Sequence, residues 1–77
     1  MNKIRRKSLN ALKDKIEDMM ADLQELLDEE QEYLDNIPEN LQGSERYESS
    51  EAAISYMEDA VAELENAMDS IEAATEY

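Results

Sequence analysis

Carboxylates are the side chains in this sequence with the widest chemical capacity. There are 21 of them among 77 residues, and in the second half a glutamate recurs at a spacing of seven. Paired carboxylates act as general acid and base where a pocket raises one pKa, and clusters of carboxylates bind divalent cations. The chain has no histidine and no cysteine, so it lacks the commonest general base and any thiol.

The spacing of these carboxylates does not match a metal or catalytic site. Di-iron bundles need Glu-x-x-His on facing helices, and calcium loops need alternating oxygen ligands around a glycine. The densest acidic run, DEEQE at residues 28–32, has neither pattern. The single glycine, Gly43, also precludes the usual phosphate loops and nucleophile elbows. We therefore predict a protein that is not an enzyme, with no catalytic residue, no metal and no cofactor.

A heptad repeat positions the acidic residues of the second half. From residue 51 the chain reads EAAISYM, EDAVAEL, ENAMDSI and EAATEY. A helix turns once in 3.6 residues, so a period of seven keeps each position on one stripe and favours a left-handed coil against another helix. The repeat predicts two apolar rows, a small-residue flank and a charged flank: Ile54, Val61 and Met68; Met57, Leu64 and Ile71; Ala53, Ala60, Ala67 and Ala74; Glu51, Glu58, Glu65 and Glu72.

The first half of the chain has the same period with a wider apolar stripe. Two main rows and a third row that widens the stripe are predicted: Leu9, Ile16, Leu23 and Ile37; Leu12, Met19, Leu26 and Tyr33; Met20, Leu27 and Leu34. Three apolar positions per heptad suit a bundle better than an isolated two-stranded coil. Glu30 interrupts the first row. Either its carboxylate reaches solvent at the edge of the stripe, or it is a buried polar residue that fixes register.

Helix-breaking residues occur only in the middle of the chain. Pro38 disfavours helical geometry at the residue before it, Gly43 lies five residues further on, and Ser44 is a good N-cap. We predict a single domain made of a helix over about residues 3–36, a connector over about 37–44 and a helix over about 45–75.

These elements predict an all-α fold, an antiparallel two-helix hairpin of the coiled-coil type. Folding about the connector places Ile37 opposite Tyr47 and Leu23 opposite Val61. Two helices cover only part of each other's stripe, and each exposed Leu or Ile forfeits about 1.5–3 kcal/mol of burial. We therefore expect a homodimer that forms a four-helix bundle.

The charge is large and uneven. The net charge is −14, of which residues 1–15 hold +5 and residues 16–77 hold −19. Such a field repels nucleic acid and anionic membranes and attracts basic protein surfaces. No apolar run is long enough to span a membrane, and no apolar stretch follows the basic start as it would in a secretory signal. The sequence favours a cytoplasmic protein without a membrane partner.

The acidic rows indicate either solvated helix faces or a surface that resembles the phosphate rows of a duplex. Our leading hypothesis is a non-catalytic interaction protein that binds a basic protein surface, in its sharpest form a nucleic-acid mimic of the kind phages use as inhibitors. The alternative is a structural protein that mainly self-associates. A third hypothesis, nucleic-acid binding through residues 3–7, is opposed by the 20 carboxylates beyond residue 15. The predicted partner-binding residues are Asp18, Glu25, Asp28, Glu32, Asp35, Arg46, Glu51, Glu58, Glu65 and Glu72.

The connector and its flanks, NIPENLQGSERYE at residues 36–48, resemble a segment of short helical proteins from Firmicutes and their phages and mobile elements. In those proteins the segment joins two acidic arms. The resemblance implies a helical hairpin and a mobile-element origin. Physically, the segment is either a well-made turn capped by Ile37, Leu41 and Tyr47, or a recognition tip in which Arg46, the only cation beyond residue 15, contacts a partner.

Overall fold

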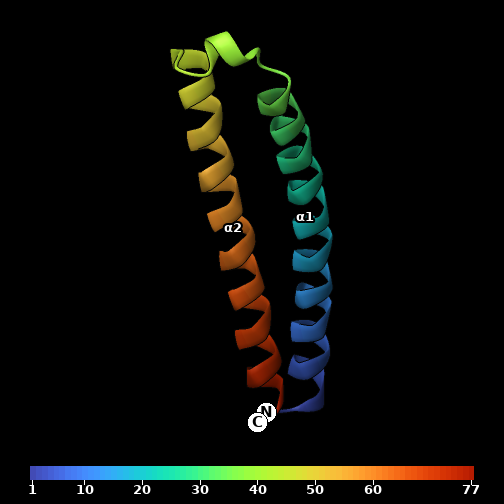
Figure 1. Cartoon of the computed structure of the whole chain (residues 1–77). Helices are drawn as coiled ribbons and strands as arrows, with labels where there is room; N and C mark the ends of the chain where they lie inside the picture. Colours follow the sequence, from blue (N-terminus) through green and yellow to red (C-terminus); the bar gives the residue numbers. More distant parts are fainter.

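The computed structural model describes all 77 residues as two long helices joined by a short connector (Figure 1). Helix α1 spans Lys3–Asp35, the short 3-10 helix η1 spans Glu39–Leu41, and α2 spans Glu45–Thr75. The helices contact each other along the hairpin, and the chain termini lie together at the end opposite the connector. The predicted helical hairpin is confirmed.

The helix boundaries follow from local capping. The side chain of Asn2 accepts a hydrogen bond from the Arg5 amide (2.8 Å), and the Ser44 hydroxyl accepts one from the Tyr47 amide (3.3 Å). Each cap satisfies a backbone donor that the first turn of a helix leaves free. Pro38, in extended geometry, prevents α1 from continuing into the connector.

Gly43 does not adopt a left-handed backbone conformation. No residue of the chain has a positive φ, and a Cβ built on Gly43 would have no atom within 4 Å. The connector therefore turns without using the conformations that only glycine adopts readily.

The helix seam uses a different pair of rows on α1 from the predicted pair. Both predicted rows of α2 are at least half-buried, as is the Leu9 row of α1. The second row on α1 is, however, the one expected only to widen the stripe, Met20, Leu27 and Leu34. The row predicted in its place is exposed: Leu12 by 49%, Met19 by 51%, Leu26 by 54% and Tyr33 by 42%.

Two polar contacts near the termini accompany this choice of seam. Arg6 and Lys13 continue the Met20 row towards the N-terminus. The Arg6 Nε donates to the Thr75 carbonyl (2.9 Å), and the Lys13 ammonium lies 3.7 Å from a carboxylate oxygen of Glu72. Both partners lie on α2. When the Met20 row of α1 faces α2, Arg6 and Lys13 can therefore make these contacts, whereas a seam through the Leu12 row would leave the two cations in solvent.

The core is small and lies near the connector. Leu34, Ile37 and Ile54 form a buried cluster against which Tyr47 packs, and Leu27 is buried further along α1. Only 5 of 77 residues are buried and none of them completely, so most of the hairpin is a thin seam. The Cα atoms span 59 × 15 × 12 Å, which describes a rod.

Candidate functional site

One long side of the hairpin gathers carboxylates from both helices. Gln31 of α1 lines a groove together with Glu51 and Glu58 of α2. The glutamate row of α2 therefore lies beside the row of α1 that contains Gln24 and Gln31. Residues three or four apart share a helix side, so neighbouring acids join this surface. The acidic face comprises Asp14, Glu17, Asp28, Asp35, Glu48, Glu51, Glu58, Glu65, Asp69, Glu72 and Glu76, all of them exposed.

Two glutamines order part of this acidic face. The Gln24 side-chain amide donates to the Asp28 carboxylate and that of Gln31 donates to the Asp35 carboxylate, both at 3.0 Å. These pairs are four residues apart on one helix side, which is the spacing at which such hydrogen bonds form. Lysines flank the acidic face only towards the termini, where Lys13 makes the single ion pair of the chain.

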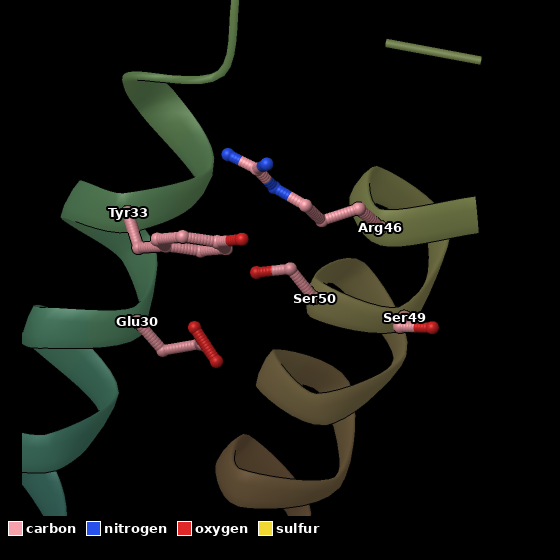
Figure 2. Close-up of a pocket in the computed structure, with 5 residues that line it drawn as sticks. All are labelled: Glu30, Tyr33, Arg46, Ser49 and Ser50. Carbon is pink, nitrogen blue, oxygen red and sulfur yellow. The ribbon is translucent and has the colours of Figure 1, made fainter. Parts of the chain in front are cut away.

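The opposite long side is apolar. At its connector end the Arg46 guanidinium lies 5.5 Å from the centre of the Tyr33 ring, so the exposed α1 row and the α2 row that begins at Arg46 are neighbours (Figure 2). Seven-residue steps from Arg46 lead to the alanine row. The apolar face comprises Leu12, Met19, Leu26, Tyr33, Ala53, Ala60, Ala67 and Ala74.

A groove of about 400 Å³ lies at the connector end of the apolar face, lined by Glu30, Tyr33, Arg46, Ser49 and Ser50. Figure 2 shows the Glu30 carboxylate and the Ser50 hydroxyl reaching into the space between the helices. The Ser50 hydroxyl is buried without a hydrogen-bond partner, and Glu30 is half-buried without an ion pair. A buried hydroxyl without a partner is costly unless another molecule satisfies it.

The predicted partner-binding residues do not form one surface. Asp28 and Asp35 join the glutamate row on the acidic face, whereas Arg46 lies on the other side of the hairpin. Three other predicted residues, Asp18, Glu25 and Glu32, form a row that is exposed along the back of α1, away from α2. The prediction omitted five other acids of the acidic face. Glu48, Asp69 and Glu76 occupy the heptad position that adjoins the Glu51 row, and Asp14 and Glu17 lie on α1.

The acidic residues form no group of three or more that could hold a metal ion. Neither helix contains a stretch long and apolar enough to cross a membrane. Comparison of the chain with protein-family models, curated proteins and solved structures gave no match.

Proposed function

We propose that this protein is a non-catalytic interaction module that binds a basic protein surface through the acidic face. The observation that supports this proposal is the separation of charge around α2. Six acids and no cation lie on the acidic side of α2, with Glu76 at its C-cap, whereas its opposite side carries only Arg46 and Glu63. Solubility alone requires charge but not its concentration on one side. A complementary basic surface gains both encounter rate and specificity from such concentration.

The sharpest version of the proposal is a mimic of nucleic acid. The eleven carboxylates of the acidic face are spread over a rod of 59 Å, or about one charge per 5 Å, whereas duplex DNA has one per about 1.7 Å of axis. One acidic face is therefore about three times sparser than a duplex. A partner that matches this charge density would carry its cations at a similar spacing along a basic groove, such as the groove of a nucleic-acid enzyme.

The test is affinity capture of the tagged protein's partners from lysate of its native host at low and moderate salt, read by mass spectrometry. We expect a basic, nucleic-acid-binding protein whose recovery falls with salt, because exposed charges are screened within about 10 Å at 0.1 M. Duplex DNA should compete with the tagged protein for this partner. Replacing Glu51, Glu58 and Glu65 with Gln should abolish the capture.

A matched control changes the net charge equally on another surface. Replacing Asp18 with Asn, and Glu25 and Glu32 with Gln, removes three charges from the back of α1 and leaves the acidic face intact. We expect this control to retain the partner. Equal loss in both triple variants would mean that only net charge matters, and recovery of the protein alone would contradict the proposal.

A second candidate function, a structural protein whose main partner is its own kind, is favoured by the exposed row of α1. Its four large apolar side chains are each about half exposed, and a contiguous exposed apolar row is typical of a protein–protein contact. Salt distinguishes the candidates, because apolar self-association does not weaken with ionic strength as charge-driven binding does.

A further inference from the structure

We propose that a second copy of this chain covers the apolar face, with the connector of each copy beside the chain termini of the other. In this arrangement Arg5 of the second copy enters the groove at Glu30. The inference is independent of the acidic-face proposal, because the apolar face lies on the opposite side of the hairpin, and it makes the second candidate function specific.

The surface area of the hairpin supports a partner as large as a second copy of the chain. The chain exposes 5828 Å², whereas a monomeric protein of 8.9 kDa exposes about 4800 Å². The excess is about 1000 Å². A stable interface buries about 800 Å² on each partner. The excess surface is thus about the area that a specific dimer buries on each chain.

The charge of the apolar face favours a second copy in particular. The charged residues that flank this face or line its groove are three cations and four acids, and they sum to −1: Arg5, Lys15, Arg46, Asp22, Glu29, Glu30 and Glu63. The remainder of the chain therefore carries −13 of the net charge of −14. Two copies can approach on this side without the repulsion that opposes contact between two acidic faces.

The distribution of charge along the rod sets the orientation. Residues 1–15 and 64–77, which form the end with the termini, sum to +1, whereas residues 16–63 sum to −15. With both connectors at one end, the two strongly acidic parts would lie side by side. With the connectors at opposite ends, each acidic tip lies beside the near-neutral end of the other copy, which is the arrangement of lower electrostatic energy.

A two-fold axis in that orientation pairs the exposed row of α1 with itself. Such an interface is self-complementary, so each contact occurs twice. Centring it on Met19 places Leu12 against Leu26 of the second copy, and Arg5 against Tyr33. The two α1 helices, which carry the large residues, would then pack against each other, as would the two α2 helices, which carry the alanines. Both pairs would be separated by distances within the 8–10 Å range of packed helices.

The same pairing completes the groove near the connector. Arg5 is exposed and makes no ion pair in its own chain, and Glu30 is half-buried and makes none either. Glu30 is one helical turn from Tyr33. When Arg5 of the second copy lies over Tyr33, it therefore reaches the Glu30 carboxylate. Glu30 then acts as the polar residue that fixes register, one of the two roles that its place in the heptad allows.

Dimerisation would also bear on the proposed function. A dimer of this length carries −28 over 59 Å, one net charge per about 2.1 Å, compared with about 1.7 Å for duplex DNA. A single hairpin has one per about 4.2 Å. This consequence rests on the proposed function, but the dimer itself does not.

The first experiment is sedimentation equilibrium of the full chain over a range of micromolar concentrations. We expect a dimer, and we expect Leu26→Gln to weaken it by more than tenfold. Leu26 is 54% exposed in the hairpin, so the variant should keep its helical circular-dichroism spectrum. The matched control is Ile4→Gln, at a residue 77% exposed and off the apolar face, which should leave the dimer unchanged. A monomer throughout, or equal effects of the two variants, would overturn the proposal.

The second experiment is a charge exchange between Arg5 and Glu30. Arg5→Glu makes each chain more acidic and Glu30→Arg makes it less acidic, so an effect of net charge alone would have opposite signs in the two variants. The proposed pairing predicts that each weakens the dimer about tenfold and that the double variant restores it to within about threefold, as a coupled pair does. If Glu30→Arg tightens the dimer, or the double variant remains weak, the proposed orientation is wrong. Neither result depends on the lysate capture, so failure of the dimer and failure of the acidic-face proposal are distinguishable.

Discussion

Replacing Ile54 with Ala is expected to lower the free energy of unfolding by about 2–3 kcal/mol. Ile54 is 6% exposed and packs in the cluster with Leu34 and Ile37. The change removes three carbons, and at about 0.8 kcal/mol per buried methylene the transfer loss is about 2.4 kcal/mol. The cavity adds little, because a cluster between only two helices can close over it, so the cost lies at the low end of the 2–5 kcal/mol range.

The assay is thermal unfolding followed by the helical circular-dichroism signal at fixed protein concentration. For a chain of this length each kcal/mol shifts the Tm by about 4–8 °C, so Ile54→Ala should melt about 8–24 °C lower. Asn66→Ala is the matched control, because Asn66 is an exposed neutral residue on the same helix. It should melt at or slightly above the wild type, since alanine has the higher helix propensity.

A small effect at Ile54 would refute the reasoning. If Ile54→Ala melts within a few degrees of Asn66→Ala, the cluster near the connector does not dominate the stability of the hairpin. The stabilising contacts would then lie along the half-buried seam towards the termini.

Two further predictions concern single residues near the connector. Ser50→Ala should raise the Tm by a few degrees, because the buried hydroxyl has no partner and its removal relieves a cost of about 1–3 kcal/mol, offset by lost packing; a lower Tm would mean that the hydroxyl is bonded in solution. Gly43→Ala should raise the free energy of unfolding in urea by about 0.4–1 kcal/mol, because Gly43 has no positive φ and its Cβ would meet no atom. A loss of stability would show that the connector needs the conformational freedom of glycine.

The helical hairpin could be predicted from the sequence because every local signal agrees with it. The heptad repeat on both sides of Pro38 predicts two helices of similar length, and the cap Ser44 predicts where the second begins. The two rows of α2 that face α1 were also predictable, because α2 has only two rows of large apolar residues and the neighbouring row is alanine.

The seam on α1 could not be predicted in the same way. Its apolar stripe has three positions per heptad, so the Leu9 row can pair with the row on either flank and satisfy the same periodicity. Within the hairpin the Met20 row, and not the Leu12 row, completes the seam. That choice depends on contacts with α2, including those of Arg6 and Lys13, which a one-dimensional pattern does not contain.

The sequence by itself determined the period, the break and the amount of charge, because these depend on the order of residues along each helix. The tertiary structure alone decided which rows become neighbours across the two helices. It brought the glutamate row of α2 beside Gln31 of α1 and brought Arg46 beside Tyr33. The physical reason is that a rotation of α1 about its own axis leaves its sequence pattern unchanged but alters every contact that it makes with α2.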